Sequence, residues 1–139
     1  MSVSSSIDFR FQPTILTREL LFSLIDSGWS FEKDGVVSYL AVGDADDFNW
    51  RKDRISRDSL FEIVSEKEKL GELIGVAMYW RGTKIGGEIL FHTSSAMSMI
   101  LSMNRMVNSK GITDVTWYLD RLVPAFKKNL ESISFSEHV

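Results

Sequence analysis

Cysteine is absent from the 139 residues of this chain, and histidine and proline each occur only twice. Without a thiol, the chain can form no disulfide, thiolate zinc site, iron–sulfur cluster or cysteine-based active site. The two histidines, His92 and His138, are far apart in the sequence and form no metal-ligand motif. We therefore expect no metal and no cofactor, and the lack of cysteine suits the reducing cytoplasm.

The chain also lacks long apolar runs. No stretch approaches the roughly 20 apolar residues that a helix needs to cross a bilayer. The segment Met1–Ile7 has neither the basic nor the apolar region of a secretory signal. These features predict a cytoplasmic protein that does not bind membranes. Because serine dominates the start of the sequence, we expect residues 1–6 to be disordered.

Apolar residues make up 44% of the sequence and charged residues 25%, a balance that can bury a hydrophobic core. At this length we expect residues 1–139 to fold as a single domain. The net charge is −3, but residues 1–47 carry eight acidic and three basic side chains, which leaves +2 for the remainder. This asymmetry can create an acidic face that attracts a basic partner, and the overall charge makes nucleic acid an unlikely ligand.

Hydrophobic periodicity divides the chain into expected strands and helices. Alternation with a period of two predicts strands at Ile7–Phe11, Trp29–Phe31, Val36–Val42, Ile74–Trp80, Ile85–Phe91 and Ile133–Phe135. Apolar residues spaced by three and four predict helices at Leu16–Ile25, Leu60–Leu70 and Val115–Phe126. Consecutive strands joined by tight turns pair antiparallel. The sequence therefore predicts an α+β two-layer sandwich, with a mostly antiparallel sheet of about five to seven strands and about three helices.

Glycines mark two special positions between and inside these strands. Asp34-Gly35 is the signal of a tight hairpin turn, and Gly86-Gly87 inside a strand indicates a bulge or a close approach of another backbone. The segment Ala96–Arg105 fits both a period of two and a helical period. We favour a strand there, because the segment follows a hairpin and can add a third antiparallel neighbour.

Cap residues define the helix boundaries. Ser59 with Glu62 fits a capping box at the start of the second helix, and Thr113 is the expected cap of the third. Gly28 and Gly71 are positioned to end the first and second helices.

The polar connection at residues 43–58 is the most unusual segment and the expected binding site. Asp44, Asp46 and Asp47 give it acidic groups, and Trp50 is either an exposed anchor or a ring packed back on the core. Alternate carboxylates can hold a hard cation, but the glycine and the bidentate glutamate of a calcium loop are missing. We therefore expect these residues to meet a partner protein rather than a metal.

A basic and aromatic cluster follows directly and offers a second interpretation. It consists of Phe48, Trp50, Arg51, Lys52, Arg54 and Arg57. Such residues can bind single-stranded nucleic acid by stacking and charge, although the neighbouring aspartates weaken the positive potential.

In size, acidity, α+β pattern and lack of catalytic motifs, the chain resembles the immunity proteins that bacteria pair with polymorphic or contact-dependent inhibition toxins. The resemblance is one of general character and includes no diagnostic motif. It implies a non-catalytic protein that binds one toxin domain and blocks its active site. On this hypothesis Asp44, Asp46 and Asp47 meet basic groups of the toxin, and Trp50 is an apolar anchor.

Two other function classes remain open. The first is an enzyme or small-ligand-binding protein whose pocket lies between helices and sheet and uses groups such as Glu88, His92 and Arg105. A catalytic triad around His92 has no support, because no glycine pattern of a nucleophile elbow marks one serine. The second is a module that associates with itself through an exposed edge of its sheet.

Overall fold

The computed structural model describes residues 3–93 and 95–138. Its helices are α1 (Thr17–Ser27), α2 (Arg57–Leu70), α3 (Val115–Phe126) and the 3-10 helix η1 (Lys127–Asn129). Its strands are β1 (Ser4–Phe11), β2 (Trp29–Ser30), β3 (Glu32–Lys33), β4 (Val36–Tyr39), β5 (Arg51–Asp53), β6 (Ile74–Trp80), β7 (Gly86–Thr93), β8 (Ala96–Met103) and β9 (Leu130–His138).

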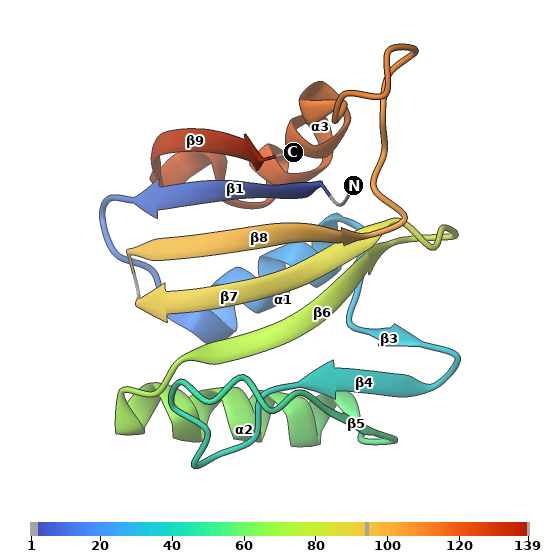
Figure 1. The fold of residues 1–139 in the computed structure, drawn as a ribbon. Helices are drawn as coiled ribbons and strands as arrows, with labels where there is room; N and C mark the ends of the chain where they lie inside the picture. Colours follow the sequence, from blue (N-terminus) through green and yellow to red (C-terminus); the bar gives the residue numbers. More distant parts are fainter. Residues whose placement is uncertain (1–2, 94, 139) are drawn as a thin grey trace.

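The strands form one antiparallel sheet in the order β3-β4-β6-β7-β8-β1-β9, and β2 and β5 add to β6 and β4 (Figure 1). The predicted α+β class, with three α-helices and an antiparallel sheet, is confirmed. The described residues form nine strands, more than the five to seven expected. The two additional strands are β3 and β5, which have only two and three residues, too few to show alternation, whereas β2 coincides with the strand predicted at Trp29–Phe31.

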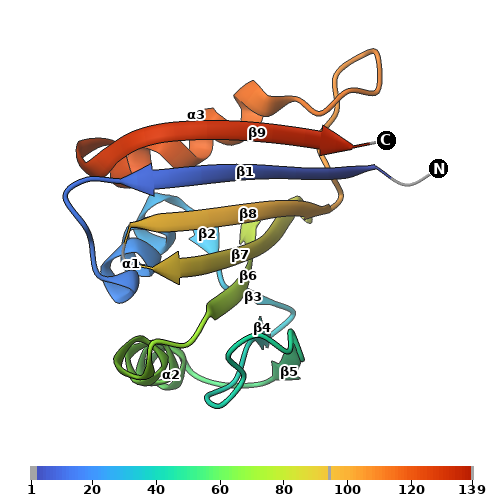
Figure 2. The ribbon, with the colours of Figure 1, turned by 60° about the vertical axis from the view of Figure 1, so that its left-hand side comes forward.

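The helices are placed against one face of the sheet, with α1 and α3 behind its strands in Figure 1 and α2 beside β4 and β6 (Figures 1 and 2). Among the described elements, α1 packs against both other α-helices, and α2 also contacts β6. The opposite face of the sheet carries no helix in the described part of the chain. Within that part, no helix is long and apolar enough to cross a bilayer.

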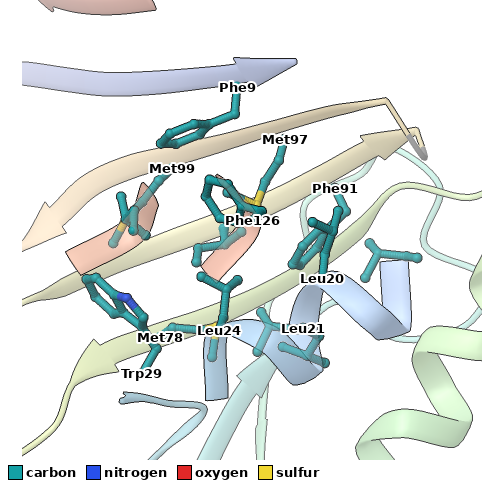
Figure 3. Packing of buried hydrophobic residues seen from close by; sticks show 14 of the residues in the cluster. Phe9, Leu20, Leu21, Leu24, Trp29, Met78, Phe91, Met97, Met99 and Phe126 are labelled. Atoms are coloured by element: carbon teal, nitrogen blue, oxygen red, sulfur yellow. The ribbon is translucent and has the colours of Figure 1, made fainter. Parts of the chain in front are cut away.

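The core lies between the sheet and the helices, and its members follow the predicted alternation (Figure 3). In β1, Ile7, Phe9 and Phe11 point inward and are almost completely buried. The Phe126 ring of α3 packs edge-on against Phe9 and Phe11, with 5.1 Å between ring centroids in each pair. Burial of such a side chain contributes about 1.5–3 kcal/mol. These contacts hold α3 on the strand that lies next to β9.

Three local predictions are confirmed. Asp34 and Gly35, both with positive φ of 54° and 78°, form the tight turn between β3 and β4. Ala96–Met103 is the strand β8 rather than a helix. The pairing of β7 with β8 shifts between Gly86 and Glu88, which is the expected irregularity.

Four local predictions were wrong. Ser4–Ser6 were expected to be disordered with the rest of residues 1–6 but belong to β1, while residues 1 and 2 lie outside the described residues. Ser56, not Ser59, caps α2, because its hydroxyl accepts the Ser59 amide at 3.1 Å. The cap of α3 is Asp114, one residue after the expected Thr113. The connection 43–58 is not entirely open, since β5 lies within it.

Candidate functional site

The acidic loop, residues 42–49, connects β4 to Trp50 and β5 and is organised by the carboxylate of Asp44. One oxygen of this carboxylate accepts the backbone N–H groups of Asp47 and Phe48 at 2.9 and 3.2 Å. The other oxygen accepts the N–H of Asn49 at 2.8 Å. Asp44 is only 8% exposed, so its charge holds the loop together and does not face solvent. The three donors also oppose binding of a cation at this carboxylate.

A buried lysine from α2 holds the base of the acidic loop. The side chain of Lys67 is fully buried, and its Nζ donates to the carbonyl oxygens of Ala41 and Asp44 at 2.6 and 2.7 Å. Its charge is paired with the carboxylate of Glu72, 3.3 Å away. Glu72 also accepts the N–H of Gly43 at 2.9 Å. Two charged side chains therefore fix the loop from below through charge-assisted hydrogen bonds.

Because its backbone is held from within, the acidic loop presents a defined set of groups to solvent. Asp46 and Asp47 are exposed, as are Val42 at 45% and Phe48 at 50%. Phe48 has a φ of 56°, which is uncommon for a residue with a side chain. An exposed aromatic ring held in such a conformation beside two carboxylates is typical of a recognition surface.

Trp50, the anchor expected from sequence, is half-buried. Its ring lies over Gly75 of β6. A Cβ atom built onto Gly75 would lie only 2.8 Å from Trp50 Cη2 and from Leu40 Cδ1. The ring thus packs back toward the sheet, which was one of the two positions considered. The exposed aromatic group of the loop is Phe48, a residue of the basic and aromatic cluster expected from sequence.

The basic side chains that follow have separate positions. Arg51 pairs with Asp53 at 3.5 Å, and Arg54 donates to the Asp34 carbonyl at 3.4 Å. Arg57 lies over the Phe22 ring of α1, 5.4 Å from its centroid. These arginines of the basic and aromatic cluster therefore do not form one surface that could bind single-stranded nucleic acid.

A second polar site lies on the uncovered face of the sheet. There Ser98 of β8 donates to Asp8 of β1 at 2.5 Å, and its oxygen lies 2.8 Å from Nε2 of His92. A hydrolytic triad places the histidine between the serine and the carboxylate. Here the serine is in the middle, so the carboxylate contacts the serine and does not orient the imidazole. The arrangement therefore differs from a triad in the order of its hydrogen bonds.

The groups considered for an enzyme or ligand site do not converge. Burial raises the pKa of Glu88 on the uncovered face of β7, where its backbone is paired with Ile100. His92 contacts Ser98, whereas Arg105 Nη1 donates to Thr113 Oγ1 at 2.6 Å. Within residues 3–93 and 95–138, no cluster of three or more histidine, aspartate or glutamate side chains could hold a metal.

No family model and no curated protein matches this sequence. Among solved structures, the chain is similar to Pseudomonas aeruginosa T6SS protein PA0821, at 13% sequence identity and a TM-score of 0.42. The similarity covers 99% of this chain and 41% of that one, so this chain spans about two fifths of the length of that structure. A likeness at this TM-score carries no functional information.

Proposed function

We propose that this chain is a cytoplasmic immunity protein that binds and neutralises a bacterial toxin domain through its acidic loop. The observation that carries the proposal is the support of this loop by Asp44, Lys67 and Glu72, which leaves Asp46 and Asp47 free to face a partner. A loop ordered before binding loses little conformational entropy on association, so more of the contact energy appears as affinity.

The exposed groups of the loop have two distinct roles in this proposal. Asp46 and Asp47 attract a basic surface and increase the rate of association, as charges near the edge of an interface do. Phe48 supplies the apolar contact, because aromatic side chains that become buried dominate the binding energy of many interfaces. The chemistry of the loop therefore fits a partner with basic groups around an apolar depression.

The test first asks whether a gene adjacent to that of this chain encodes a toxin domain. If it does, association of that domain with the chain is measured by biolayer interferometry at low and physiological salt. We expect D46N/D47N to slow association at low salt by about tenfold and to weaken its salt dependence. We expect F48A to increase the dissociation rate by about tenfold or more. D26N/D120N changes two exposed aspartates on α1 and α3 and serves as the control for net charge.

Survival of cells that express the toxin domain supplies the functional readout. Co-expression of the wild-type chain should restore growth, and F48A should reduce this protection. If the wild-type chain neither binds the domain nor protects the cells, the immunity proposal fails. If the wild-type chain protects the cells and both loop variants, D46N/D47N and F48A, behave like wild type, the interface lies elsewhere on the protein.

A further inference from the structure

The two edges of the sheet differ in how they are protected against pairing with another strand. At the β3 and β5 edge the strands are two and three residues long and carry Glu32, Lys33, Arg51 and Lys52. Short, charged strands are a common means of preventing edge-to-edge association. The β9 edge has nine residues and contains neither lysine nor proline, and its central segment Ser132–Ser136 is uncharged.

The β9 strand is also firmly held along its inner side. It pairs with β1 from Ser4 opposite His138 to Phe11 opposite Leu130, with one irregularity near Phe11. Near its C-terminal end, Glu137 accepts hydrogen bonds from Ser5, at 2.8 Å, and from Thr113. In the sheet order β9 has β1 as its neighbour on one side, and no described strand lies on the other. Alternate backbone groups along this outer side are therefore available to a further strand.

We propose that this edge binds a second copy of the chain, with the two β9 strands antiparallel about a two-fold axis at Ser134. In this register Ile133 of each copy lies opposite Phe135 of the other, and Ser132 lies opposite Ser136. Ile133 and Phe135 are paired with Phe9 and Ile7 of β1, so they lie on the helix-covered face. They are 38% and 36% exposed, because no strand covers them from outside. Cross-strand pairs of an aromatic and a β-branched residue stabilise antiparallel sheets.

The strand pair alone is too small for a stable dimer. Nine residues span about 30 Å of an interface about 10 Å thick, which corresponds to roughly 600 Å² over both copies. Stable interfaces bury about 1,200 Å² or more. Helix α3 lies behind β9 and β1 (Figure 2). A depression of about 420 Å³ on this helix is lined by Leu119, Val123 and Pro124 together with the charged residues Asp120 and Lys127. Contacts between the two α3 helices supply the remaining area.

Charge sets an upper limit on the affinity. In the proposed register Glu131 lies opposite Glu137 of the second copy at each end of the strand pair. Like charges placed opposite each other destabilise a sheet. Arg105 lies 3.5 Å from Glu137 and offsets part of this repulsion. The dimer should therefore be reversible and should become stronger as salt screens the glutamates.

The mass of the full chain in solution tests the proposal by light scattering during size-exclusion chromatography. We expect the wild type to approach twice its monomer mass of 15.8 kDa as concentration rises. I133K should remain at the monomer mass, because a lysine at the edge opposes pairing. I112K introduces the same change at an isoleucine that is 50% exposed on the protruding 107–113 hairpin, and it should still dimerise. Thermal unfolding confirms that both variants are folded.

Because the chain has no cysteine, a single introduced thiol reports the two-fold axis directly. S134C should form a disulfide-linked dimer under mild oxidation, since position 134 faces itself across the axis. S102C, at an exposed serine of β8, should not. A wild-type protein that stays monomeric at high concentration, or a dimer unaffected by I133K, overturns the proposal. The acidic loop lies toward the other edge of the sheet, so these results do not depend on toxin binding.

Discussion

The Nζ atom of Lys67 lies 2.7 Å from the main-chain carbonyl oxygen of Asp44, and this contact joins the last turn of α2 to the acidic loop. Asp44 in turn holds the next residues of the loop through its carboxylate. The surface offered by Asp46, Asp47 and Phe48 thus depends on two charged residues that are themselves hidden from solvent.

Replacement of Lys67 by methionine should lower the free energy of unfolding by about 3 kcal/mol. Methionine fills most of the same space, but Glu72 then keeps a poorly solvated charge and two loop carbonyls lose their donor. Urea denaturation measures the change, and amide hydrogen exchange should show faster exchange in residues 43–49. K69M removes an exposed lysine two positions later and should change stability by less than about 0.5 kcal/mol. Equal effects of the two substitutions would show that Lys67 does not support the loop.

Conversion into asparagine should lower the stability of the fold at Asp44 but not at Asp46. D44N should destabilise the fold by about 1–3 kcal/mol, because an amide has only one acceptor oxygen and the carboxylate uses two. D46N removes an exposed charge and should leave the melting temperature nearly unchanged. Differential scanning fluorimetry checks both values. A harmless D44N would mean that the loop does not need its internal hydrogen bonds.

Glu137 should make stability depend on pH below neutrality. Hydrogen bonds from Thr113 and Ser5 hold the pKa of Glu137 below its usual value of 4.5. A carboxyl with a lowered folded-state pKa stabilises the fold above its unfolded pKa, and this contribution is lost as pH falls through the folded value. Thermal unfolding at a series of pH values should therefore show E137Q as less stable than wild type at pH 7. The difference should shrink in acid, and a constant difference would contradict the assignment.

Glu88 should behave in the opposite sense. Burial raises the pKa of Glu88 above 4.5, so the folded state binds this proton more tightly than the unfolded state does. The stability associated with that proton is present at low pH and is lost as pH rises through the raised pKa. E88Q should therefore increase the melting temperature at pH 7, and the gain should disappear in acid. If E88Q is destabilising at pH 7, the carboxylate has a stabilising contact that burial alone does not describe.

Gly87 of β7 should not tolerate a side chain. A Cβ added at Gly87 would come within 2.1 Å of the Ile100 carbonyl oxygen, and backbone cannot move away as a flexible side chain can. G87A should cost at least about 3 kcal/mol or prevent folding. G111A, where nothing lies within 4 Å and only the φ of 78° opposes a side chain, should cost about 1 kcal/mol. Chemical denaturation of the two variants distinguishes steric overlap from conformational cost.

The sheet was predictable from sequence where the strands are long enough to alternate. Ile7, Phe9 and Phe11 showed a period of two, and they are the apolar residues that β1 buries. The short strand β5 was not predictable, because Arg51–Asp53 has no apolar residue and forms a strand only through its pairing with Val37–Tyr39. Helix starts were missed by one to three residues, because several polar residues near each start can serve as the cap.

The acidic loop was located from sequence, but the roles of its residues were not. A run of aspartates shows no difference between Asp44, which turns inward, and Asp46, which does not. The buried position of Lys67 was also hidden, because a lysine in a charged helix normally faces water. Its pairing with the loop arises from tertiary contacts between segments more than 20 positions apart. Such contacts leave no local pattern in the sequence.

The position of β1 between β8 and β9 has a consequence for biosynthesis. Residues 4–11 are synthesised well before both strands that flank them, at 96–103 and 130–138. The nascent chain therefore carries an unpaired β1 until residues 96–103 have been made, and closure of this half of the sheet waits for distant segments. Folding of this half should consequently be slow compared with the local β6–β7 hairpin, and a chaperone that shields β1 during synthesis would act at the step where the chain is most exposed to aggregation.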